Sequence, residues 1–363
     1  MRSILQITCV ALACVLLWML PGVRKVAGDS RQVVRGEVVE VDDSALQVHG
    51  HVEFGTEYLK VKLPNGKTYS ATNELRAQME LDKKFAVGDS AAVLVPVDAD
   101  DDTVLVARDH WRRDWTVGLC VVFVVLLCVF GGMTGFKALL SFVFSCLAIW
   151  KLLIPLALAG WHASSVAFLV VASLSAVIMY LVAGFTKKGI SAFFGSMLGV
   201  VSSLALAHFF SRTMHVNGAT MPFAQTLLFS GYGFLDLQDV FIGAIVLASS
   251  GAVMDLGMDI AAGVREVKRH NPSLGFGALF GSGIAIGRAV VGTMTTTLLL
   301  AYSGGYLTLL MVFAAQGTHP ADFINSTLVS AEIVKTFVGS LGLVLVAPFT
   351  AFVSASMFAG GAD

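Results

Sequence analysis

The chain has 363 residues, of which 56 % are hydrophobic and only 13 % are charged, and its formal net charge is −1. This composition is typical of a membrane protein and excludes an ordinary soluble globular protein. The charges are concentrated in residues 22–115, which hold 30 of the 49 acidic and basic side chains and have a local net charge of −4. A mildly acidic segment also argues against nucleic-acid binding, which would require a basic surface.

The first apolar run, residues 4–20, ends at a Pro-Gly pair. A signal peptidase requires small residues at two positions of its cleavage site, and residues 25–27 fit this requirement badly. We therefore expect residues 1–21 to be an uncleaved transmembrane signal anchor with its N-terminus in the cytoplasm.

Residues 22–115 are predicted to form an extracytoplasmic β domain. Short stretches between residues 32 and 107 alternate apolar and polar side chains or are rich in β-branched residues. The sequence Pro64-Asn65-Gly66 is a hairpin-turn signal. Five or six short strands suggest a small closed barrel of the OB type. The domain contains no cysteine, and His49 and His51 lack a third ligand nearby, so we expect no metal site.

Residues 116–363 are predicted to form a multi-pass transmembrane domain. The expected spans are residues 116–133, 138–160, 164–185, 190–211, 239–264, 275–303, 306–316 and 330–358. Several are near the roughly 20 residues that cross a bilayer, whereas 306–316 is short and also fits a tilted, re-entrant or buried element. With the anchor, the expected fold is an α-helical polytopic membrane protein with about 8–9 transmembrane segments and an inserted all-β, OB-like domain.

The basic residues of the short loops predict the orientation of the chain. With the N-terminus inside, the inner loops collect Lys137, Lys187, Lys188, Arg265, Lys268 and Arg269. The outer turns hold little beyond His162 and Arg212. This is the positive-inside bias of membrane proteins, and it places the β domain outside the cytoplasm.

Three charged residues lie inside the apolar runs between residues 240 and 301. Asp255 and Arg288 are each about 16 residues from the turn at Asn271-Pro272, so two antiparallel helices would bring them to the same depth. Charges at membrane depth are costly and mark working sites. We therefore expect a buried Asp255–Arg288 pair, with Asp259 as a second acid that a purely structural pair would not need.

Both charged faces are also rich in small residues. Helical periodicity puts Ala248, Gly251, Asp255, Asp259 and Ala262 on one side of the first helix. On the second helix, the corresponding stripe consists of Gly277, Gly281, Arg288, Gly292 and Thr295. Because small residues let membrane helices approach closely, we predict that Gly251, Gly277, Gly281 and Gly292 pack the two helices together.

Three further polar residues are candidates for binding a solute or ion. Glu332 and Lys335 are three residues apart on the last span and can neutralise each other on one helix. Thr295 begins a run of three threonines that can bond to their own helix, although one hydroxyl can face a cavity.

The membrane sequence also resembles a known family. The motifs are GAVMD at 251–255, RE-x-K-x-x-NP at 265–272, SG at 282–283, IGR at 286–288 and GTMTTTLLLAYSGG at 292–305. They resemble the YibE/F family of bacterial multi-pass membrane proteins, and the resemblance extends over most of the chain, including the β domain. It implies a bacterial plasma (inner) membrane protein of a kind sometimes taken for a permease. Ala289 and Thr296 depart from the family pattern, which often has an acid and an asparagine there.

The leading functional hypothesis is a transporter or permease. Asp255, Asp259 and Arg288 would serve proton- or cation-coupled movement of an unknown small solute. The alternative is a non-transporting scaffold that binds an envelope partner through its β domain. The sequence contains none of three motifs that would indicate a metalloprotease, a serine hydrolase or a nucleotide-binding protein: HExxH, G-x-S-x-G and GxxxxGK[ST]. We therefore expect no enzyme, no catalytic residue, no metal and no cofactor, with the lipid bilayer as the surrounding partner.

Overall fold

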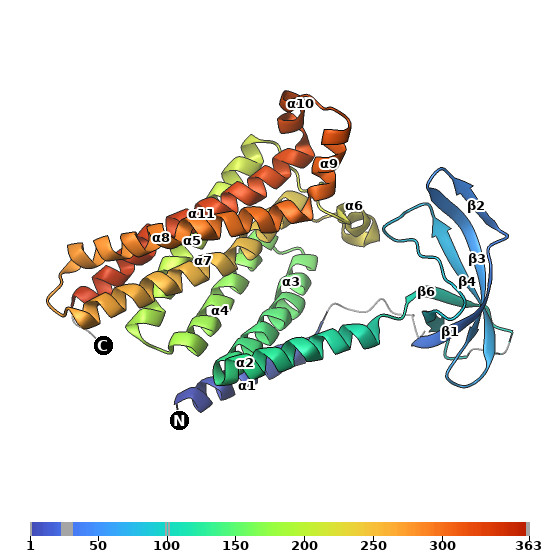
Figure 1. The fold of residues 1–363 in the computed structure, drawn as a ribbon, viewed down its shortest axis with the longest axis horizontal. Helices are drawn as coiled ribbons and strands as arrows, with labels where there is room; N and C mark the ends of the chain where they lie inside the picture. Colours follow the sequence, from blue (N-terminus) through green and yellow to red (C-terminus); the bar gives the residue numbers. More distant parts are fainter. Residues whose placement is uncertain (1, 23–31, 99, 101, 361–363) are drawn as a thin grey trace. The chain divides into compact units, whose positions relative to one another are not determined.

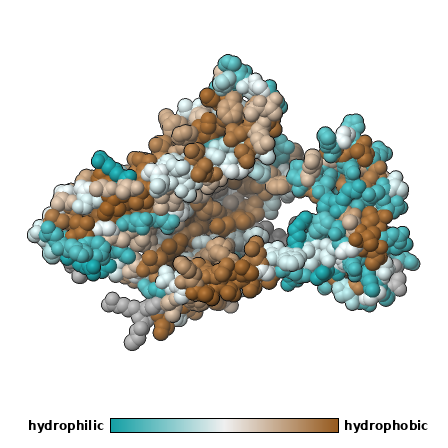
Figure 2. Space-filling model, viewed as in Figure 1, coloured by the Kyte–Doolittle hydropathy of each residue, from teal (hydrophilic) through white to brown (hydrophobic). Residues whose placement is uncertain are grey.

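The computed structural model describes residues 2–22, 32–98, 100 and 102–360. The chain divides into two compact units: Met1–Val23 with Leu127–Asp363, and Arg24–Leu126. The first unit is a helical bundle, and the second holds a β domain and the start of a helix (Figure 1). Brown, apolar residues cover much of the bundle surface, whereas the β domain is mainly hydrophilic (Figure 2), as expected for a membrane unit and a water-exposed unit.

The strands of the β domain close into a barrel. They are β1 (Gln32–Asp42), β2 (Leu46–His49), β3 (Val52–Lys62), β4 (Thr68–Arg76), β5 (Ser90–Val95) and β6 (Leu105–His110). β1 pairs with both β3 and β5, so five strands close in the order β1-β3-β4-β6-β5, and β2 is added at one end of β3. Among these six described strands, only β4 and β6 pair in parallel. This is the strand order of an OB-type barrel, built from alternating sequences that direct every second side chain inward.

The barrel buries a carboxylate. Glu57 on β3 is fully buried beside the buried Asn73 on β4. Asn73 donates from Nδ2 to Glu57 Oε2 (2.8 Å) and to the carbonyl of Lys83 (2.6 Å), and the Phe85 amide donates to Glu57 Oε1 (3.2 Å). These bonds attach the β4–β5 connection to the barrel. Burial raises the pKa of Glu57 above its ordinary value, although the hydrogen bonds from Asn73 and Phe85 oppose this shift.

A glycine interrupts the first long apolar helix. Helix α2 (Arg113–Ala148) continues through a π-helical segment, η1 (Ile149–Leu153), into α3 (Ile154–Leu158). A straight helix of this length would measure about 69 Å, more than twice the roughly 30 Å hydrocarbon thickness. Gly132 has φ 52° and ψ −130°, which are not helical. Gly132 therefore divides this stretch into two helices, which correspond to the predicted spans 116–133 and 138–160.

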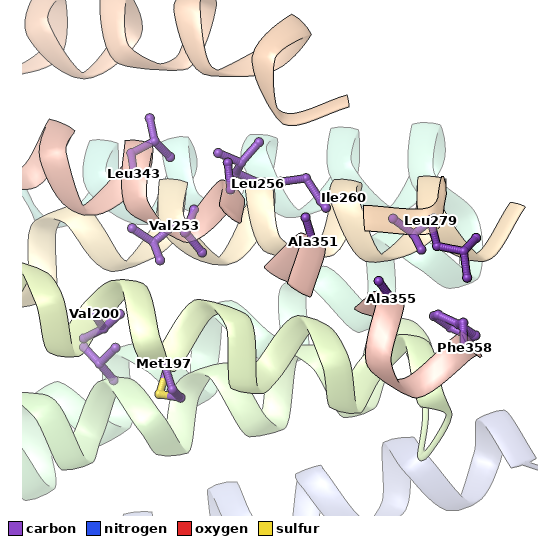
Figure 3. Packing of buried hydrophobic residues seen from close by; sticks show 14 of the residues in the cluster. Met197, Val200, Val253, Leu256, Ile260, Leu279, Leu343, Ala351, Ala355 and Phe358 are labelled. Atoms are coloured by element: carbon purple, nitrogen blue, oxygen red, sulfur yellow. The ribbon is translucent and has the colours of Figure 1, made fainter. Parts of the chain in front are cut away.

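Five other long helices complete the bundle. They are α4 (Ala163–Ala183), α5 (Lys187–Thr213), α7 (Leu237–His270), α8 (Phe276–Gly305) and α11 (Thr327–Ala359). α11 packs against α5, α7 and α8, and α7 also contacts α4 and α5. Side chains from α5, α7, α8 and α11 meet in an apolar core (Figure 3).

The number of spans is lower than the sequence predicts. Among the described residues, six helices are long and apolar enough to cross a membrane when the kinked stretch Arg113–Leu158 is counted as one. The expected span 306–316 forms only α9 (Leu307–Ala315), which at nine residues would cover about 14 Å, half of the hydrocarbon thickness. Three shorter elements, α6 (Ala224–Leu227), η2 (Leu228–Tyr232) and α10 (Pro320–Asn325), lie in the connections.

The N-terminal helix α1 (Arg2–Met19) is packed into the bundle. Lys151 donates to the Leu20 carbonyl at 2.9 Å, just beyond the end of α1. Lys137 donates to the Gln6 side chain and to the Leu181 carbonyl, each at 3.0 Å. Both lysines therefore satisfy acceptors near helix ends, which would otherwise be unpaired. Residues 25–27, which fit a cleavage site badly, lie outside the described residues.

Small residues of α5 make a close helix contact with α11. Cβ atoms added to Gly195 and Gly199 would lie 2.6 Å from Thr350 Cα and 2.9 Å from Val346 Cβ. A Cβ at Gly342 of α11 would lie 3.1 Å from Ser203 Cβ. Residues 195, 199 and 203 repeat every four positions, which is the spacing that lets two membrane helices touch backbone to backbone.

Candidate functional site

The turn between α7 and α8 sets the relative position of their charges. α7 ends at His270 and α8 begins at Phe276, so the turn comprises residues 271–275. Buried Lys268 holds this turn, because its ammonium donates to the carbonyls of Pro272 (2.8 Å) and Leu274 (2.9 Å). The centre of the turn is therefore near Ser273, two residues later than the Asn271-Pro272 bend that the sequence suggests.

This shift changes which residues share a depth in the membrane. Added Cβ atoms at Gly263, Gly283 and Gly287 would lie 2.5 Å from Ile286, 3.1 Å from Val264 and 3.3 Å from Ile260, respectively. In this register Arg288 is level with Asp259. Asp255 is one helical turn, about 6 Å, away from that level.

The expected Asp255–Arg288 pair is not formed. Ile286 faces α7, and Arg288 lies two residues further along, about 200° around the helix axis. Arg288 therefore points away from the side of α8 that contacts α7. Within the described part of the chain, Asp255, Asp259 and Arg288 take part in no ion pair or side-chain hydrogen bond, and all three are exposed in the isolated subunit.

The predicted packing role of four glycines is also wrong. Cβ atoms at Gly251, Gly277, Gly281 and Gly292 would meet no atom within 4 Å. α8 instead packs through Gly283 and Gly287, where added Cβ atoms would lie 2.7 and 2.8 Å from the Cβ atoms of Ala351 and Ala347. The reason is geometrical: Gly281 and Gly283 are two residues apart and so lie on nearly opposite sides of the helix.

An uncovered stripe on α7 carries both acids. Its exposed members are Ala244, Ala248, Gly251, Asp255 and Asp259. Asp255 is near the middle of this 34-residue helix, and Asp259 follows one turn later. Ala244 also lines an apolar cavity of about 330 Å³ formed with α3, α4 and the segment before α7. The stripe therefore differs from an ordinary lipid-facing surface, because its two acids have no counter-ion among the described residues.

Among the described residues, the other candidates form no ion pair or hydrogen bond with these acids. Lys335 Nζ is 2.8 Å from Glu332 Oε1, so this pair is a local contact on α11. Thr296 and Thr297 donate to Gly292 and Thr293 carbonyls of their own helix, each at 3.0 Å. The Thr295 hydroxyl is buried and has no hydrogen-bond partner in the described residues.

One acid with a clear structural role was missed by sequence reasoning. Asp239 is largely buried near the start of α7 and accepts from the Ser164 amide (3.2 Å) and the Ser164 hydroxyl of α4. It therefore caps a neighbouring helix, where a carboxylate favourably meets free amides and the helix dipole. The sequence signal is an acid at a helix start, but the partner helix is 75 residues away.

Metal-binding groups do not gather in the described residues: no cluster of three His, Cys, Asp or Glu side chains could hold an ion there. His208, for example, uses Nδ1 to contact the Leu204 carbonyl of its own helix at 3.1 Å.

Comparison with known proteins agrees with the motifs of α7 and α8. A family model described as YibE/F-like protein matches residues 119–360, two thirds of the chain. The chain belongs to the YibE/F-like family. The match begins within α2 and does not extend to the β domain, which the resemblance had included. No curated protein and no solved structure matches the chain.

Proposed function

We propose that this YibE/F-like membrane protein is a transporter or permease that couples movement of a small solute to protons or cations. The observation that carries the proposal is the position of Asp255. It lies near the middle of α7 on an uncovered face, and no basic side chain of the described subunit pairs with it. Intramembrane acids of this kind are the usual coupling groups of carriers.

The chemistry follows from the cost of an unpaired charge. An ionised carboxylate in an apolar medium is unfavourable unless a cation or a proton neutralises it. Asp255 would therefore bind a proton or cation when its face opens to one side and release it when the face opens to the other.

Labelling with dicyclohexylcarbodiimide tests this proposal, because this apolar reagent reacts with protonated carboxyl groups. In lipid vesicles we expect labelling of Asp255 that falls as the pH rises or when the coupling cation is added, as mapped by mass spectrometry. Potential-driven proton uptake should fall at least about tenfold in Asp255→Asn, a loss of about 1.4 kcal/mol or more in transition-state stabilisation. Glu266→Gln is the control, since Glu266 is exposed and pairs with Arg269. An unlabelled Asp255 together with full uptake by Asp255→Asn would contradict the proposal.

The alternative function is a scaffold that binds an envelope partner through the β domain. A groove of about 720 Å³ on the β domain favours this alternative. The groove exists because β4 and β6 are joined by only two residue pairs before they diverge. Its charged lining consists of Glu74, Arg76, Asp82, Lys83, Arg108 and Asp109. A scaffold predicts the reverse pattern: Asp255→Asn retains the cellular phenotype, whereas Arg76→Glu with Arg108→Glu abolishes it.

We also infer that the protein lies in the bacterial inner membrane with the N-terminus in the cytoplasm and the β domain outside. The support is the basic charge of the α4–α5 and α7–α8 turns, which lie at the same end of the bundle (Figure 1). A tag inserted after Lys187 is expected to be protected in intact cells, and one inserted after Gly66 to be accessible once the outer membrane is opened. Accessibility of both tags from one side of the inner membrane would contradict this orientation.

A further inference from the structure

The uncovered face of α8 differs from the other outer faces of the bundle. α5 exposes Phe194, Leu198 and Val201, large apolar side chains of the kind that face lipid. Between Gly277 and Thr297, the described part of α8 exposes no large apolar side chain. Its exposed residues there include Gly277, Ala278, Gly281, Ala285, Arg288, Ala289, Gly292, Thr293, Thr296 and Thr297. Small and hydroxylated residues of this kind form helix–helix interfaces in membranes.

On this face of α8, Arg288 lacks an acidic partner among the described residues. Arg288 is close to the middle of α8, exposed, and without an acidic partner in the described subunit. A guanidinium facing hydrocarbon at this depth is costly, so such residues face protein or water and pair with acids. The subunit also carries uncovered acids without a basic partner, Asp255 and Asp259, on a different helix face.

We propose that this face of α8 packs against a second copy of the chain, with Arg288 pairing with Asp259 of that copy. Depth supports this choice of occupant. In the α7–α8 register Arg288 is level with Asp259, and a symmetry axis along the membrane normal keeps corresponding levels equal between copies. The charge that each subunit lacks is therefore present on its neighbour at the matching depth. Asp255 remains unpaired in this assembly. The proposed assembly does not depend on whether the chain transports a solute.

A charge exchange between two co-expressed variants tests the pairing. Arg288→Asp alone places an acid opposite Asp259, and Asp259→Arg alone places two basic groups together. Each variant is therefore expected to weaken self-association about tenfold or more, which corresponds to about 1.4 kcal/mol of association free energy. Co-expressed under different tags, the two variants restore opposite charges at both contacts and should form mixed complexes. Subunits are counted by single-molecule photobleaching in dilute lipid vesicles, so the measurement does not depend on transport.

Glycine substitutions provide a test that does not alter charge. A Cβ added at Gly281 meets no atom of its own subunit within 4 Å, so Gly281→Leu should remain folded but become monomeric. The control is Leu198→Ala. Leu198 is exposed on the outer face of α5, so this substitution should leave assembly unchanged. Three results would each overturn the proposal. Wild-type protein could bleach in single steps, or Gly281→Leu could assemble normally. The co-expressed charge variants could also form mixed complexes no more often than each variant alone associates with itself.

Discussion

A leucine at Gly195 is expected to abolish folding of the membrane unit. Even the first added atom, the Cβ, would lie 2.6 Å from the backbone Cα of Thr350 in α11. Backbone cannot move aside as a flexible side chain can, and the contact lies in a close-packed interface where overpacking typically costs about 1–3 kcal/mol or more. Leucine adds three further carbons beyond this Cβ. Because α11 also contacts α7 and α8, separating it from α5 disturbs the whole core.

The measurement is the yield of monodisperse protein by fluorescence-detected size-exclusion chromatography, together with its thermal unfolding. Gly195→Ala should be intermediate, and Gly281→Leu is the matched control because its Cβ meets nothing within 4 Å. We expect near-normal yield for the control and almost none for Gly195→Leu. Similar yields for these two leucine variants would show that the α5–α11 contact is not tight.

Loss of the Glu57 carboxylate is expected to destabilise the β domain by about 3 kcal/mol. Glu57→Ala leaves the Asn73 amide and the Phe85 N–H without their buried acceptor, and each unsatisfied buried donor costs about 1–3 kcal/mol. Glu74→Ala is the control, because Glu74 is exposed and pairs with exposed Arg76. Residues 24–115, expressed alone, provide the sample for urea unfolding. Equal midpoints for the two alanine variants would contradict this role of Glu57.

The same carboxyl group gives the domain a defined pH dependence. Since burial raises the pKa of Glu57 in the folded state, the folded domain holds a proton that the unfolded chain releases above about pH 4.3. The contribution of Glu57 to stability therefore falls as the pH rises through this region and levels off above the folded pKa. Asp42 and Asp109 have lowered pKa values, so their contributions are lost in the opposite direction, as the pH falls below about 3.9. The free energy of unfolding of wild type minus that of Glu57→Gln should therefore decrease from pH 4 upward. An increasing difference would contradict a raised pKa.

Local composition determined much of the fold. Apolar length predicts α4, α5, α7, α8 and α11, because a helix that crosses hydrocarbon must be apolar over roughly 20 residues. Alternation predicts the strands, because only one side of each strand faces the barrel interior. Asn271-Pro272 correctly predicts where α7 ends, because proline disfavours helix in the residue before it. These properties depend on neighbours in the sequence and can be read from it.

The charged site required the tertiary structure. Asp255, Asp259 and Arg288 were identified from their rarity inside apolar runs, and their uncovered positions keep them as candidates. Their pairing was predicted wrongly because both sides of α8 carry glycines, at positions 281 and 283. Sequence periodicity defines these two sides but does not say which one meets α7. The five-residue turn then moved the register so that Arg288 is level with Asp259. Rotation and register depend on the fit of side chains such as Ile286 against Gly263, a contact between distant residues that no local pattern contains.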